Sequence, residues 1–238
     1  MSHRIPRTIL SAAASLVLLW YAAGTGAQPI LATGPNADVT KEDLHRVDPS
    51  IMEAAWVRPD LDLSRYSRIL LVPTGVQFRE VADRLYNVLN RGDVTEFALD
   101  DGKKEWLRGV WRQAVDARFA QEPSYEFYDG VGPDVLVVQG LLVDVVSRIP
   151  PDYSVGSDYS LVRDPWSANV VLELRDGTTA ELLARTIDRR NAEGLVDVGT
   201  VWVRTEDLVE VWARVLFDRL QQLSDLGAAG PGTPTWAR

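Results

Sequence analysis

Cysteine is absent from this chain of 238 residues, and histidine occurs only twice. The absence of cysteine excludes disulfide bonds, thiolate metal sites, iron–sulfur clusters, cysteine nucleophiles and lipid attachment through a cysteine. His3 and His45 stand alone, each in a segment without a regular apolar period. The sequence also has no phosphate-binding loop, no dinucleotide glycine fingerprint and no Gly-x-Ser-x-Gly elbow. We therefore expect no metal, no cofactor and no recognisable catalytic residues.

Positive charge is scarce relative to negative charge. Lysine and arginine number 25 against 34 aspartates and glutamates, so the formal net charge is −9. A nucleic-acid partner needs a basic footprint, which this balance argues against. The apolar share of 46% and the charged share of 25% are typical of a globular protein. The length suits one domain with additional segments.

The first residues have the order of a secretory signal peptide. Arg4 and Arg7 precede an apolar run over residues 9–23, and small residues follow up to Ala27. We expect a Sec-type signal over residues 1–27, which would place the protein in the periplasm or outside the cell with no stable membrane anchor. The alternative is an inner-membrane anchor formed by an uncleaved signal. The run is shorter than the roughly 20 apolar residues that a spanning helix needs, which favours cleavage.

Three further segments follow the signal. Residues 28–51 are rich in proline, glycine and polar side chains and are predicted to be a flexible linker. Residues 52–226 are predicted to form a single domain. Residues 227–238, which contain Pro231 and Pro234, are predicted to be a disordered tail.

Two segments have the apolar period of an amphipathic helix. The stripe from Trp106 to Phe119 predicts a helix over residues 103–120, with Asp100 and Asp101 at its positive end. A second stripe predicts a helix that begins with Thr205 as N-cap and ends before Gly227. A weaker pattern over residues 78–89 is compatible with a short third helix.

The strands are indicated by apolar runs and by alternation. Residues 69–72 and 135–146 are nearly continuous apolar runs, which predict central strands. Residues 170–175 and 182–189 alternate around the turn Asp176-Gly177, which predicts a hairpin in which Glu173 and Arg185 pair. Together these elements predict an α+β fold, with a predominantly antiparallel sheet of about four strands and two amphipathic helices packed on one face.

Residues 147–167 are predicted to be a long connection. It carries Tyr153, Tyr159 and Trp166, whereas the other tryptophans at helix spacing fit a core. Long loops in compact domains often carry function. These three aromatic residues are therefore the candidate binding residues, with an envelope protein or cell-wall material as the expected partner.

Two alternatives to a non-catalytic interaction or scaffolding module remain open. A carboxylate-dependent hydrolase acting on cell-wall glycan needs no sequence motif, and Glu173, Asp188 and Asp144 are its candidate acids. Acids on strands are more often paired with arginine, and Arg175, Arg185 and Arg189 lie nearby in the sequence. A lipid or small-ligand carrier would need a sizeable cavity between helices and sheet.

An ordered set of short segments resembles a bacterial envelope family catalogued as domain of unknown function 3313. The set comprises Ala55-Trp56-Val57-Arg58-Pro59, Asp62-Leu63-Ser64-Arg65-Tyr66, Ile69-Leu70-Leu71-Val72-Pro73, Gly132-Pro133-Asp134-Val135-Leu136, Ala168, Glu173-Leu174-Arg175-Asp176, Leu183-Ala184-Arg185, Asp188-Arg189-Arg190 and the helix with Trp212. The likeness spans residues 52–224 and implies a small envelope protein with no assigned activity. Many members are lipoproteins, but this chain has no lipid-bearing cysteine. The resemblance therefore implies a periplasmic form without a lipid anchor.

Overall fold

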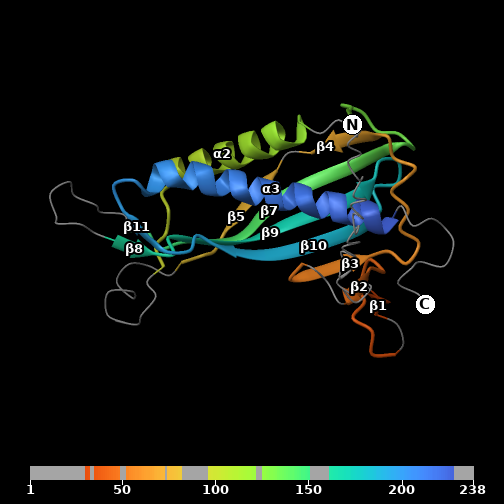
Figure 1. Ribbon diagram of the computed structural model, residues 1–238, viewed down its shortest axis with the longest axis horizontal. Coiled ribbons are helices and arrows are strands. Elements are labelled where there is room, and N and C mark those ends of the chain that lie inside the picture. The colour runs from red at the N-terminus through yellow and green to blue at the C-terminus, as the bar shows by residue number, and fades with distance from the viewer. Residues whose placement is uncertain are drawn as a thin grey trace, which may run out of the picture.

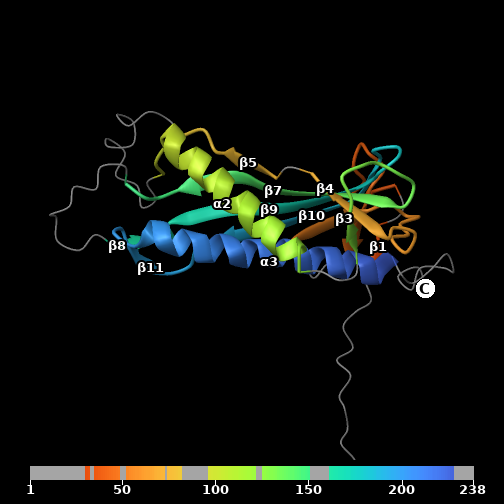
Figure 2. The same cartoon turned by 90° about the horizontal axis from the view of Figure 1, so that it is seen from above.

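The computed structural model describes residues 30–32, 35–48, 52–72, 74–81, 96–121, 125–150 and 161–227. A long twisted sheet forms one layer, and the helices α2 (Asp101–Phe119) and α3 (Val201–Gly227) form the other (Figure 1). Seen from above, α3 runs along one side of the sheet and α2 crosses the strands obliquely, and the two helices run in the same general direction (Figure 2). The two amphipathic helices that the sequence predicts are both present.

The main sheet has nine strands within the described residues, in the order β1-β2-β3-β10-β9-β7-β4-β6, with β5 also paired to β7. A separate two-stranded sheet, β11-β8, lies at one end. The strands are β1 (Ile30–Leu31), β2 (His45–Asp48), β3 (Ala54–Val57), β4 (Arg68–Leu71), β5 (Gly75–Phe78), β6 (Glu126–Phe127), β7 (Val135–Ser147), β8 (Leu161–Arg163), β9 (Trp166–Asp176), β10 (Leu182–Asn191) and β11 (Leu195–Asp197).

The predicted sheet of about four mainly antiparallel strands is wrong, because the sheet is larger and mixed. β4 pairs with both β6 and β7 in parallel, and β5 also runs parallel to β7. Parallel neighbours need a long crossover connection, and α2 lies within the connection from β5 to β7. The central hairpin, β9 with β10, and the pair β7 with β9 are antiparallel.

The predicted linker over residues 28–51 is wrong where the structure describes it. β2 pairs with β3, and β1 pairs with β2, so this segment extends the sheet. Leu44 and Val47 within it are buried. Strands of two to four residues are too short to show alternation in a sequence, which is why β1, β2 and β3 were not predicted. The predicted signal peptide and residues 228–238 of the predicted tail lie outside the described residues.

The two helices confirm the amphipathic stripes but correct one boundary. Asp100 is the N-cap of α2, and its carboxylate accepts a hydrogen bond from the Lys103 backbone N–H at 2.8 Å. α3 begins at Val201, four residues before the predicted N-cap Thr205. The Thr205 hydroxyl instead donates to the Val201 carbonyl and accepts from the Trp166 indole. The predicted short helix over residues 78–89 is not present at residues 78–81, where Phe78 ends β5, and residues 82–89 lie outside the described residues.

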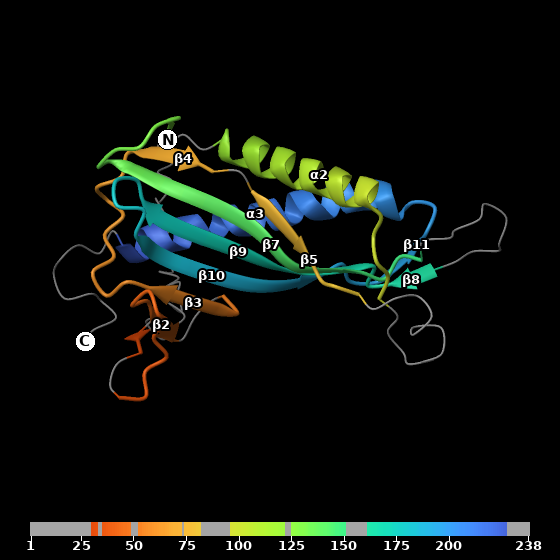
Figure 3. The ribbon, with the colours of Figure 1, turned by 180° about the vertical axis from the view of Figure 1, so that it is seen from behind.

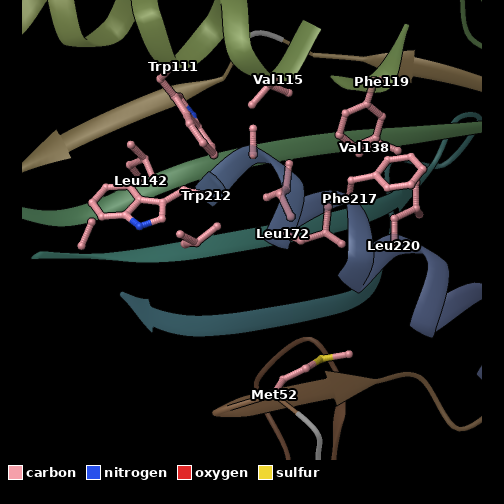
Figure 4. Packing of buried hydrophobic residues seen from close by; sticks show 14 of the residues in the cluster. Met52, Trp111, Val115, Phe119, Val138, Leu142, Leu172, Trp212, Phe217 and Leu220 are labelled. Carbon is pink, nitrogen blue, oxygen red and sulfur yellow. The ribbon is translucent and has the colours of Figure 1, made fainter. Parts of the chain in front are cut away.

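Aromatic and aliphatic side chains fill the space between the helices and the sheet (Figure 4). Phe119 of α2 and Phe217 of α3 meet edge to face at 5.5 Å, and Trp111 and Trp212 are both buried in the same cluster. The sheet contributes Val138, Leu142 and Leu172 to this layer. The carrier alternative needs a cavity in this layer, which side chains occupy in the described part of the chain.

Candidate interaction surface on the helix-free face of the sheet

The predicted binding residues do not form one site. Trp166 lies in β9 with only 2% of its surface exposed, and its indole N–H donates to the Thr205 hydroxyl at 2.8 Å. It is therefore a core residue that joins the sheet to α3, and its predicted place in a partner-facing loop is wrong. Tyr153 and Tyr159 lie outside the described residues, so their binding role stays a prediction.

The acids of the hydrolase alternative lie on opposite faces of the sheet. Asp188 points toward α3, where it forms a two-point ion pair with Arg219 at 2.7 and 2.8 Å. Glu173 is paired across the strands with Arg185, three residues before Asp188, and so points to the other face. A pair of glycosidase carboxylates must flank one bond, and these two acids cannot do so.

Asp144 is the third acid of that alternative. It lies at an irregularity in β7 with a φ of 58° and is paired through both oxygens with the Arg79 guanidinium. The hydrogen bonds from Arg79 hold the pKa of Asp144 below its usual range, although burial acts in the opposite direction. A carboxyl group in this state stays ionised and is a poor proton donor near neutral pH.

One face of the sheet is free of helices within the described residues. Figure 3 shows β7, β9 and β10 in front of α3, with α2 above them beside β5. Gly140 of β7 marks the opposite, covered face, because a Cβ there would lie 2.6 Å from a methyl carbon of Leu216 in α3. Its neighbours Gln139 and Leu141 therefore point to the helix-free face, since side chains alternate along a strand.

A polar row crosses this face from strand to strand. Gln139 stands opposite Glu173, Glu173 opposite Arg185, and Arg185 opposite Trp56 of β3. Glu173 accepts from Arg185 at 2.8 Å and from Arg175 at 2.7 Å, and its side chain is only 10% exposed. One carboxylate between two guanidinium groups leaves a local surplus of positive charge in a chain whose net charge is −9.

An apolar row runs beside the polar row. Leu141, Val171 and Ile187 are direct cross-strand neighbours, and each lies two residues along its strand from a member of the polar row. Val171 is 7% exposed, and the other two are intermediate. An antiparallel sheet face that meets water normally carries alternating polar side chains. Apolar neighbours at its centre, next to arginines, are typical of a surface that contacts another molecule.

We call the residues of these two rows, with Arg175, the helix-free face. Its chemistry suits apolar contact at the centre and ion pairing with acidic groups at the arginines. The sequence predicted the Glu173–Arg185 pair, and the structure confirms it. It did not predict that these residues join Gln139 and Trp56 in one row, because the order of strands in the sheet is not visible in the sequence.

Two further observations limit the chemistry of the described part of the chain. Within it, no three His, Asp or Glu side chains gather closely enough to hold a metal ion. Neither α2 nor α3 contains an apolar stretch of the length that a membrane span requires.

Comparison with known proteins gives no family. No family model matches the chain, and no curated protein is similar to it in sequence. The resemblance to domain of unknown function 3313 therefore stays a prediction.

Solved structures show only weak similarity to the chain. The PelC dodecamer from Paraburkholderia phytofirmans has 8% identity and a TM-score of 0.34 over 70% of this chain and 94% of that one. A homologue of neuraminyllactose-binding hemagglutinin from Helicobacter pylori has 6% identity and a TM-score of 0.38 over 72% and 94%. The hypothetical protein CT253 from Chlamydia trachomatis has 10% identity and a TM-score of 0.35 over 67% and 98%. These values establish neither a family nor a function for the chain.

Proposed function

We propose that this chain is an exported, non-catalytic interaction module of the bacterial cell envelope, which binds an acidic partner through the helix-free face. The observation that carries the proposal is the apolar row of Leu141, Val171 and Ile187 beside the surplus of arginine on a face that no described helix covers. Export rests on the signal-like residues 1–27 and on the resemblance to an envelope family.

The charge of the face selects the kind of partner. Arg175 and Arg185 share one carboxylate, so one guanidinium charge remains for an incoming group. Arg189 follows on the same side of β10, since it lies four residues after Arg185. Guanidinium groups next to apolar surface bind carboxylates well because they are weakly hydrated and present a planar fork of donors. We therefore expect the partner to present acidic groups around an apolar centre.

Site-specific photocrosslinking in intact cells tests this proposal. A photoreactive residue at Ile187 is expected to capture a partner, and mass spectrometry identifies it. The matched control carries the same residue at Asp116, which is exposed on α2. Crosslinks that form at Asp116 as readily as at Ile187 would show that the helix-free face is not the binding surface.

A charge variant tests the kind of partner. Arg189→Glu replaces a positive charge with a negative one at the exposed end of β10. It is expected to weaken capture at Ile187 several-fold or more, because a charge-assisted contact contributes about 1.5–3 kcal/mol. Arg163→Glu makes the same change on an exposed residue of the separate sheet β11-β8 and serves as the control. Unchanged capture with Arg189→Glu would argue against an acidic partner.

A further inference from the structure

The two helices leave a groove on the side that faces away from the sheet. They run in parallel, since Trp106 meets Trp202 and Phe119 meets Phe217, each pair with ring centres 5.5 Å apart. The groove between them has a volume of about 540 Å³, and its apolar lining includes the half-buried Val110 and Ala114 of α2. A groove between two helices is suited to receive a third helix.

Charged side chains of both signs line this groove: three come from α3, and Arg118 of α2 lies over the Phe217 ring. Glu206, Glu210 and Arg214 follow one another at intervals of four residues along α3 and are all exposed. Within the described residues, none of the three makes an ion pair or a side-chain hydrogen bond. The charge along the groove therefore changes from negative to positive in the direction of α3.

Exposed valines lie on the same helix. Val203 is 70% exposed and Val211 is 47% exposed, whereas most apolar residues of α3 are buried. Val203 and Glu210 are seven residues apart and so lie on the same side of the helix. The outer surface of α3 thus combines apolar contact area with ordered charges.

The order of the charges points to one occupant. When α3 meets a second α3 in the antiparallel direction about a point between Glu210 and Arg214, Glu210 of each copy lies beside Arg214 of the other. This arrangement obeys two-fold symmetry, in which the same patch on each copy contacts the other. We propose that a second copy of this chain docks in the groove, with Glu210 of each copy paired with Arg214 of the other and with Val203 and Val211 covered.

This proposal goes beyond the proposed function, because the groove and the helix-free face lie on opposite sides of the molecule. A two-fold pair that buries the helices leaves both helix-free faces open. The module would then present two binding faces that point away from each other, which raises avidity for a partner that carries repeated sites.

Sedimentation velocity of the purified protein tests the pair, since it measures the mass in solution. The wild type is expected to sediment with the mass of two chains at high concentration. Glu210→Arg and Arg214→Glu are each expected to give the mass of one chain, because each variant sets like charges against each other. Both positions are exposed, and circular dichroism checks that the helices remain.

An equimolar mixture of the two variants provides the decisive measurement. The reversed charge in each variant then meets its complement in the other, so the mass of two chains is expected to return. Arg112→Glu, on an exposed position of α2 outside the groove lining, is the control and should leave the wild-type mass unchanged. A wild type with the mass of one chain at every concentration, variants that still pair, or a mixture that stays unpaired would each overturn the proposal. Crosslinking at Ile187 tests the proposed function independently of sedimentation. If the protein does not form a two-fold pair, the proposed function is therefore unaffected.

Discussion

Two buried threonines differ in whether their hydroxyl groups are hydrogen-bonded. The hydroxyl of Thr186 in β10 is buried without a hydrogen-bond partner, whereas that of Thr205 in α3 bonds both Trp166 and the Val201 carbonyl. A buried polar group without a partner costs free energy, and a paired one stabilises. The same substitution should therefore have opposite effects at these two positions.

We expect Thr186→Val to raise the free energy of unfolding by about 1 kcal/mol, since the shape is kept and the unpaired hydroxyl is removed. Thr205→Val should lower it by about 1–3 kcal/mol, because the Trp166 indole loses its acceptor. Urea denaturation followed by circular dichroism measures both values. Destabilisation by Thr186→Val would mean that its hydroxyl has a partner.

Asp176 links stability to pH. Burial would raise the pKa of this carboxyl, but hydrogen bonds from the backbone N–H groups of Thr179 and Thr178 and from the Tyr66 hydroxyl outweigh burial and lower the pKa to about 2. The unfolded chain has an Asp pKa of about 3.9. As the pH falls from about 4 toward 2, the unfolded state therefore binds a proton before the folded state does, and stability is lost.

Asp176→Asn should reduce this loss and also lower stability at pH 7, because the charge that holds these hydrogen bonds and Arg65 is removed. We expect a cost of about 1–3 kcal/mol at neutral pH. Denaturation curves at several pH values between 2 and 7 measure both effects. A variant whose stability falls as steeply as that of the wild type below pH 4 would show that Asp176 is not responsible.

At the scale of elements, two glycines illustrate how the environment decides the effect of a methyl group. Gly177, in the turn of the β9–β10 hairpin, packs against the start of β7, where a Cβ would lie 2.5 Å from the Val135 carbonyl oxygen. Gly109, on the exposed side of α2, has no atom within 4 Å of that position. Backbone atoms cannot move aside as the end of a side chain can. Of these two positions, only position 177 therefore requires glycine.

Gly109→Ala is accordingly expected to stabilise the protein by about 0.5–1 kcal/mol, since glycine weakens a helix interior by this amount. Gly177→Ala should destabilise it by about 1–3 kcal/mol, as overpacking does. Thermal unfolding of the two variants beside the wild type measures the difference. Equal melting temperatures for both variants would contradict the close approach at Gly177.

For the whole molecule, the N-terminal strands decide where the folded unit begins. Removal of residues 1–29 leaves β1 and β2 in place, whereas removal of residues 1–49 deletes both strands, including the buried Leu44 and Val47. Each fully buried side chain of this size contributes about 1.5–3 kcal/mol. The longer deletion is expected to lower the free energy of unfolding by about 3 kcal/mol or more, and the shorter one is the control. Equal stability of the two would restore the linker interpretation.

The sequence by itself determined the elements whose signals are local. The stripe from Trp106 to Phe119 is sufficient to define α2, and the alternation around Asp176-Gly177 is sufficient to define the β9–β10 hairpin with its Glu173–Arg185 pair. The absence of cysteine likewise excluded thiol chemistry without any structure. These features depend on neighbouring residues alone.

Only the tertiary structure decided how the elements meet. The direction of β4 and β5 beside β7 depends on the crossover that contains α2, and the burial of Trp166 depends on α3, which lies 39 residues away from it at Thr205. The helix-free face takes Gln139, Glu173, Arg185 and Trp56 from four strands. Side chains that are distant in the chain become neighbours through strand order, which is set by packing of the whole core and leaves no period in the sequence.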